Sequence, residues 1–222
     1  MAGGTPHRIE IVSDAICPWC WIGKTHLDAA LALLAEDGLT FELGWLPYQL
    51  NPDMPPEGVD RRDYRTRKFG SWERSQQLDA QVAEAGRAAG LDFRHDLMLR
   101  TPNTVEAHRM IRLAGEAGVQ HALVERLFRA YFNAGKDIGD TAVLAAEAAA
   151  AGVPEPAIEA FRAGTAGREE VVAESLGLAQ AGITGVPSFL MDRHLLFSGA
   201  MPAERMAEGF RRAVSILESR AA

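Results

Sequence analysis

The chain has 222 residues, of which 47% are hydrophobic and 24% are charged, as in ordinary globular proteins. This length suits one large domain, or a small domain that carries an insertion. The formal net charge of −7 argues against a general nucleic-acid binder and against a protein that binds anionic membranes.

The N-terminal residues 1–8 lack the basic start, the apolar stretch and the small-residue cleavage site of a secretory signal. Elsewhere the chain has no apolar run long enough to cross a bilayer. We therefore expect a cytoplasmic protein with no membrane partner and no nucleic-acid partner. Because the cytosol keeps most thiols reduced, a disulfide in this protein is expected to be transient.

The first elements predict a parallel β-α-β unit. A short apolar pattern predicts a strand over residues 9–13, and apolar residues at helical spacing predict a helix over residues 21–34. Gly38 ends this helix, and residues 40–46 form a second strand pattern. Two parallel strands joined by a helix require a crossover, which we expect to be right-handed.

A long helical segment follows, with almost no strand signal between residues 61 and 177. Cap residues such as Asn103 and Asp140, and stops such as Gly90 and Gly152, mark the ends of its helices. The predicted helices cover residues 60–69, 71–89, 103–117, 119–134, 140–151, 154–163 and 167–180.

The α/β signal returns near the C-terminus. Residues 188–191 and 195–197 read as a hairpin around a turn at 192–193, and residues 203–219 read as an amphipathic helix. The predicted organisation is an α/β domain in two parts, with a helical domain inserted between them. The first part covers residues 1–58, the insertion residues 59–178 and the second part residues 179–222.

The only two cysteines form the sequence Cys17-Pro18-Trp19-Cys20 directly after the first strand. A structural disulfide framework would place its cysteines in distant segments, and a metal site would need further ligands, so we expect no metal. Two thiols separated by two residues at the start of a helix favour thiol–disulfide exchange. Two reduced core cysteines on one helix are the alternative.

Pro18 suggests different roles for the two thiols. Proline is favoured at the first helical position, which puts Cys17 at the N-cap. There backbone N–H groups and the helix dipole favour the thiolate, so we expect the pKa of Cys17 to lie below the free value of about 8.5. Cys17 is then the attacking thiol, and Cys20 is the resolving thiol that releases the partner by closing the Cys17–Cys20 bond.

Four segments stand out in the sequence: residues 13–23, residues 48–52, residues 100–104 with 107–108, and residues 183–189. In this order they resemble the DsbA-like branch of the thioredoxin superfamily, over nearly the whole chain. The chain is most similar to the FrnE-like group, described as dithiol–disulfide isomerases or relatives of 2-hydroxychromene-2-carboxylate isomerase. The resemblance implies an α/β thioredoxin-like fold, with a central mixed sheet and a large all-helical insertion.

The resemblance also implies further site residues. Pro187 would be a cis-proline facing the cysteines, with the backbone of Val186 exposed to an extended substrate strand. Asn103 and His108 would open a helix that covers the active site in this family; a plain helix cap and a structural histidine are the alternatives. The candidate substrate-binding residues are Pro18, Trp19, Asn103, His108, Val186 and Pro187.

The predicted function is a thiol–disulfide oxidoreductase or isomerase that acts on protein or small-molecule disulfides, without a tightly bound cofactor. The alternative is a glutathione-dependent isomerase or transferase of the related kappa-class type, with glutathione as co-substrate. Those enzymes need no second thiol and carry an Asp-Arg pair where this chain has the apolar residues 200–203. A non-catalytic binder or chaperone is a third class. A homodimer is the default assembly.

Overall fold

The computed structural model describes the backbone of residues 7–221 and the side chains of residues 7–219. The expected lack of a secretory signal rests mainly on residues 1–6, which lie outside the described residues. From residue 7 onward, the order of strands and helices follows the sequence prediction closely.

A four-stranded sheet in the order β2-β1-β5-β6 forms the centre of the α/β domain. Strand β1 (His7–Ser13) is parallel to β2 (Phe41–Pro47) and antiparallel to β5 (Ser188–Met191), which in turn pairs with β6 (His194–Ser198). This is the mixed sheet that the sequence predicts. Strand β1 is central, so the residues that follow its carboxyl end are supported by neighbours on both sides.

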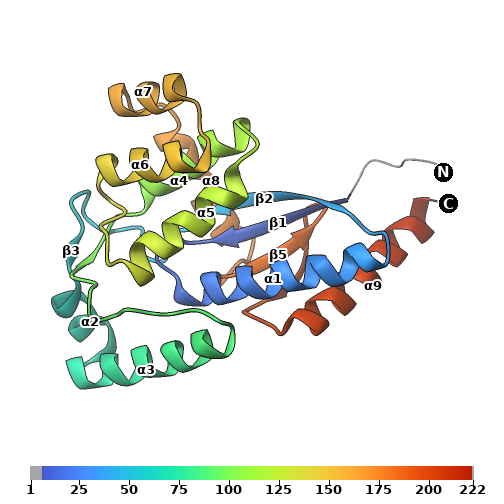
Figure 1. Ribbon diagram of the computed structural model, residues 1–222, viewed down its shortest axis with the longest axis horizontal. Coiled ribbons are helices and arrows are strands. Elements are labelled where there is room, and N and C mark those ends of the chain that lie inside the picture. Colours follow the sequence, from blue (N-terminus) through green and yellow to red (C-terminus); the bar gives the residue numbers. More distant parts are fainter. Residues whose placement is uncertain (1–6, 222) are drawn as a thin grey trace.

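Helix α1 (Pro18–Glu36) connects β1 to β2 and packs against the C-terminal helix α9 (Ala203–Ala221). Figure 1 shows the two helices side by side along the sheet. Leu27 and Leu34 of α1 are fully buried in the same core as Phe210 of α9, as expected for apolar side chains at helical spacing. This packing fixes the axis of α1 and therefore the position of its N-terminus.

The insertion is helical, and its helices agree with the predicted ranges to within two residues at each end, apart from one long segment. That segment, predicted as a helix over residues 119–134, ends in the π-helical turn η1 (Arg129–Asn133). The helices are α2 (Arg61–Phe69), α3 (Trp72–Ala88), α4 (Val105–Glu116), α5 (Gln120–Phe128), α6 (Thr141–Ala151), α7 (Glu155–Ala163) and α8 (Arg168–Gln180).

One small element has no signal in the sequence. Strands β3 (Val59–Asp60) and β4 (Arg100–Thr101) form an antiparallel ladder that ties the start of the insertion to the segment before α4. Strands of two residues are too short to show alternation, so periodicity does not reveal them.

The helices of the insertion form two groups around the sheet and α1 (Figure 1). Helices α4, α5 and α8 contact β2, whereas α3 contacts α1. Trp21 of α1 joins the groups, because its buried ring stacks near Phe128 and Phe132 and meets Phe93 edge-on. The first turn of α1 is therefore held from several directions, and this turn carries both cysteines.

Candidate active site

The turn between β1 and α1 places Cys17 at the N-cap of α1, with Pro18 as the first helical residue. Cys17 has an extended backbone (φ −90°, ψ 112°), and its N–H donates to the carbonyl of Asp14 at 3.0 Å. Proline suits the next position because the first helical N–H has no intrahelical partner. Cys20 follows one turn inward, and both cysteines are free thiols.

The surroundings of the Cys17 sulfur differ from the prediction that first-turn N–H groups bond to it. That prediction is wrong: the side chain of Cys17 makes no capping hydrogen bond. Instead its thiol donates to the carbonyl oxygen of Val186, with 3.6 Å between the two atoms. The Val186–Pro187 loop packs over the sulfur, so Cys17 is only 4% exposed rather than open to solvent.

Cys20 lies deeper and is fully buried. Burial raises the pKa of its thiol well above the ordinary value, and the neighbouring Cys17 raises it further. The side chain of Ser13 and the backbone of Asp14 act in the opposite direction, since they favour the Cys20 thiolate. At neutral pH Cys20 is therefore a protonated thiol that lies behind Cys17.

The loop that covers Cys17 is in direct contact with α1. The peptide bond between Val186 and Pro187 is cis. A Cβ atom added to Gly23 of α1 would lie 2.8 Å from Cγ of Pro187, so only glycine leaves room for the proline ring. The carbonyl of Pro187 accepts a hydrogen bond from Gly199 at 2.8 Å, which ties the loop to the end of β6.

Cys17 opens into a cavity of about 380 Å³ that also reaches α2 and α3. We call it the cysteine cavity. Trp19 stands at its surface with 43% of the residue exposed. The active-site loops contribute Ile16, Cys17, Pro18, Trp19, Leu50, Asn51, Gly185 and Val186, and the polar residues of the insertion are Arg61, Tyr64, Arg65, Lys68, Asp79, Gln81, His95, Thr101 and Tyr131.

A family model, that of the DSBA-like thioredoxin domain, matches residues 8–211. The chain belongs to this family. The probable DsbA oxidoreductase of Streptomyces coelicolor is 32% identical to it, with a TM-score of 0.82 over 94% of this chain and 90% of that one.

Two further solved structures share the fold at lower sequence identity. The cytosolic disulfide reductase DsbM of Pseudomonas aeruginosa is 20% identical, with a TM-score of 0.63 over 97% of this chain and all of that one. A 2-hydroxychromene-2-carboxylate isomerase is 14% identical, with a TM-score of 0.64 over 96% of this chain and 97% of that one. The predicted DsbA-like thioredoxin fold is confirmed.

The cysteine cavity of this DsbA-like protein carries excess positive charge. Asp79 binds Arg61 at 2.8 Å and Arg65 at 2.6 Å, and Lys68 adds a third cation. Desolvation lowers the pKa of His95 below its usual value, so this imidazole is neutral at pH 7. Three cations and one carboxylate thus line the cavity that Cys17 also lines.

Two arginines of the basic run at residues 61–68 turn away from solvent. Arg61 is buried and Arg65 is half-buried, because both reach across to Asp79 on α3. Helical periodicity shows which residues share a face of one helix, but it does not show which residue of another helix will pair with them. Asp79 and His95 were missed for this reason.

Three candidate residues do not line the cysteine cavity: Asn103, His108 and Pro187, whose ring packs against Gly23 of α1. Asn103 donates to the carbonyl of Met54 at 2.7 Å, and its side-chain oxygen accepts from the N–H of Val105 at 2.9 Å, so it holds the start of α4 from one position before the N-cap Thr104. His108 is buried on α4 and lines a second cavity. Pro18, Trp19 and Val186 do meet Cys17 in the cysteine cavity. The substrate-binding roles of all these residues stay predictions.

Other kinds of site have little support in the described residues. Among residues 7–219, no group of three or more histidine, cysteine, aspartate or glutamate side chains is arranged to hold a metal ion. Within the same part of the chain, none of the helices combines the length and the apolarity needed to cross a membrane.

Proposed function

We propose that this DsbA-like protein is a thiol–disulfide oxidoreductase and isomerase of the FrnE-like group, and that Cys17 and Cys20 are its redox-active pair. The observation that carries the proposal is the unequal placement of the two thiols at one helix start. Cys17 lines the cysteine cavity, whereas Cys20 is sealed behind it as a thiol with a raised pKa. Only Cys17 can meet a substrate.

The reaction proceeds in two exchanges. The Cys17 thiolate attacks one sulfur of a substrate disulfide, which forms a mixed disulfide and releases the first substrate thiolate. Cys20 then loses its proton and attacks the Cys17 sulfur. The second substrate thiolate leaves, and the Cys17–Cys20 disulfide closes. Two electrons pass from the dithiol to the substrate, and the reverse sequence oxidises a dithiol.

The carbonyl of Val186 becomes available to bind substrate when the mixed disulfide forms. In the reduced protein its carbonyl accepts a hydrogen bond from the Cys17 thiol. Once that sulfur has been deprotonated and bonded to substrate, the carbonyl is free to accept an N–H from an extended segment beside the mixed disulfide. Main-chain pairing of this kind does not depend on the substrate's side chains. It therefore allows protein disulfides of varied sequence, as well as small-molecule disulfides, to bind.

The setting of this activity is part of the proposal. We place the protein in the cytoplasm, the location stated in the name of the Pseudomonas relative, and we propose no tightly bound cofactor and a homodimer as its assembly. A cytosolic pair of this type would be reduced and reoxidised repeatedly.

The positive cysteine cavity favours one second candidate, a glutathione-dependent isomerase or transferase of kappa-class type. Arg61, Arg65 and Lys68 suit a thiol that carries carboxylates. Against it, the chain keeps Cys20 and has apolar residues at 200–203. Calorimetry with glutathione on a Cys20→Ser variant separates the two: tight binding, with retained isomerisation of a chromene substrate, would favour this candidate.

Substitution of each cysteine tests the proposed roles. Cys17→Ser should abolish insulin reduction, because no thiol that lines the cysteine cavity remains to start the exchange. In Cys20→Ser, Cys17 should still attack the substrate disulfide, but no thiol remains to resolve the mixed disulfide. This variant should therefore accumulate a mixed disulfide on Cys17 that mass spectrometry detects. Full insulin reduction by Cys17→Ser would contradict the proposal, as would a substrate adduct on Cys20 in the wild type.

A further inference from the structure

The second exchange requires that Cys20 lose a proton while it is sealed inside the protein. A thiol attacks a disulfide as the thiolate. Cys20 is 0% exposed and is not among the residues that line the cysteine cavity, where Cys17 would hold the substrate in the mixed disulfide. The proton must therefore leave through groups behind the pair.

Ser13 is the polar side chain placed to receive this proton. It is the last residue of β1, and its side chain interacts with the Cys20 sulfur and favours the thiolate. Ser13 also lines a cavity of about 620 Å³ between the sheet and helices α4, α5 and α8, which we call the rear cavity. One hydroxyl thus favours the thiolate of the buried Cys20 and borders an open space.

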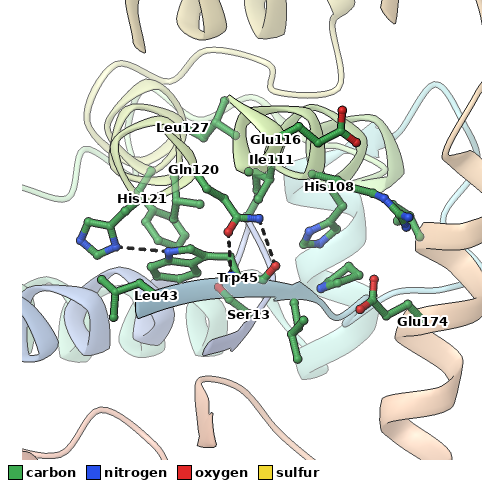
Figure 2. A pocket seen from close by; sticks show the side chains of 18 of the residues that line it. Ser13, Leu43, Trp45, His108, Ile111, Glu116, Gln120, His121, Leu127 and Glu174 are labelled. Atoms are coloured by element: carbon green, nitrogen blue, oxygen red, sulfur yellow. Dashed lines mark hydrogen bonds between the residues drawn. The ribbon is translucent and has the colours of Figure 1, made fainter. Parts of the chain in front are cut away.

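The rear cavity is polar enough to carry a proton. Figure 2 shows His108, Ile111 and Gln120 reaching from α4 and α5 toward the strand that carries Trp45. A cavity of this volume with several polar walls accommodates hydrogen-bonded water. The charged and titratable groups along its walls are Arg8 of β1, His108, Arg112 and Glu116 of α4, His121 of α5 and Glu174 of α8.

His108 is the buried side chain of this cavity that has a nitrogen free to bind a proton or a hydrogen-bond partner. It is 4% exposed, and its Nε2 has no hydrogen-bond partner among the described residues. Nε2 lies 3.5 Å from a carboxylate oxygen of Asp14, the residue after Ser13, so the ring nitrogen is close to the chain segment that carries the relay. His121, by contrast, is already bonded to Trp45 at 3.2 Å and to Asp28 at 2.7 Å.

We propose that the rear cavity is the proton exit of the resolving thiol, with the Ser13 hydroxyl as the relay and His108 as the acceptor. This inference rests on the proposed function. As Cys20 attacks the Cys17 sulfur, its S–H proton passes to Ser13, which passes its own hydroxyl proton through water in the cavity to Nε2 of His108. The Cys17–substrate bond breaks, the substrate leaves as the thiolate with the electron pair, and the imidazolium returns its proton to solvent.

The test uses 5,5′-dithiobis(2-nitrobenzoate), which releases one coloured thiolate when Cys17 attacks and a second when Cys20 resolves. Ser13→Ala and His108→Gln should each slow the second release by about tenfold or more, within the usual size of proton-transfer catalysis. The first release should change by less than about twofold. Ser13→Thr, which keeps the hydroxyl, should restore the second release.

Matched controls separate proton transfer from simple disturbance of the core. Ser175→Ala removes another buried hydroxyl, and His121→Gln alters the same cavity at a histidine that already has partners. Both should leave the two releases unchanged. In wild type the rate of the second release should also fall in deuterium oxide. In His108→Gln this rate should increase only at higher pH, where the Cys20 thiol ionises without help.

The outcomes distinguish this inference from the proposed function. If the first release is absent in wild type, the proposed function fails. If both releases occur and Ser13→Ala and His108→Gln leave the second one unchanged, the proton exit is wrong. A second release that shows no solvent isotope effect in wild type would also overturn it, whether or not the variants fold.

Discussion

Cys17 and Cys20 are chemically identical side chains three positions apart, and their surroundings give them different properties. Cys17 meets the Val186 carbonyl and borders the cysteine cavity, whereas Cys20 faces the core, Ser13 and the backbone of Asp14. The Cys-Pro-Trp-Cys sequence predicts the order of attack. It does not predict Ser13 as a partner of Cys20, because that contact depends on how β1 lies against the first turn of α1.

The raised pKa of Cys20 predicts how the stability of the reduced protein depends on pH. In the unfolded chain this thiol ionises near its ordinary value of about 9, while in the folded protein it stays protonated to higher pH. Ionisation then favours the unfolded state, so stability is lost as pH rises above that value. The loss is at most about 1.4 kcal/mol per pH unit.

Denaturant unfolding of the reduced protein between pH 7 and pH 10.5 checks this prediction. The free energy of unfolding of wild type should fall with pH more steeply than that of Cys20→Ser, which has no titrating group at this position. Parallel curves for the two proteins would show that burial does not hold Cys20 as a thiol.

At the scale of elements, the contact between α1 and the Val186–Pro187 loop leaves no room for a side chain at Gly23. Gly23→Ala would place a methyl group 2.8 Å from the Pro187 ring, which has little freedom to move away. We expect the loop to shift from Cys17. The rate of Cys17 attack should fall by about tenfold, and stability should fall by about 1–3 kcal/mol.

Gly177→Ala is the matched control, since Gly177 lies inside helix α8 and an added Cβ would meet nothing within 4 Å. Alanine there should stabilise the protein by about 0.5–1 kcal/mol and leave the attack rate unchanged. Stopped-flow thiol assays and denaturant unfolding on both variants provide the measurements. Equal attack rates for Gly23→Ala and wild type would refute the claimed role of this close approach.

Elements were predicted from the sequence where a local rule governs them. Asp140 caps α6 through a hydrogen bond to the N–H of Ala142, and Gly152 ends the same helix in the left-handed region (φ 96°). Such signals lie within a few residues of each other. The β3–β4 ladder, the π-helical turn at 129–133 and the Asp79 ion pairs depend on segments brought together by the fold, so no local pattern reveals them.

At the scale of the whole molecule, the site lies where the two parts of the α/β domain and the insertion meet. The first part supplies the cysteines, the second supplies Val186 and Pro187, and the insertion supplies the charged wall of the cysteine cavity. The segments of the resemblance mark the first two of these contributions, but none of them includes the charged wall. They also led to Asn103 and His108, which the structure places away from the cysteine cavity.

A redox titration of the full chain in glutathione buffers, followed by mass after quenching, tests the central claim most directly. We expect one reversible two-electron transition, in which the protein loses two hydrogens as Cys17 and Cys20 join. A chain whose thiols never pair across the whole range of buffers would contradict the account. So would a stable glutathione adduct on Cys17 that Cys20 leaves unresolved.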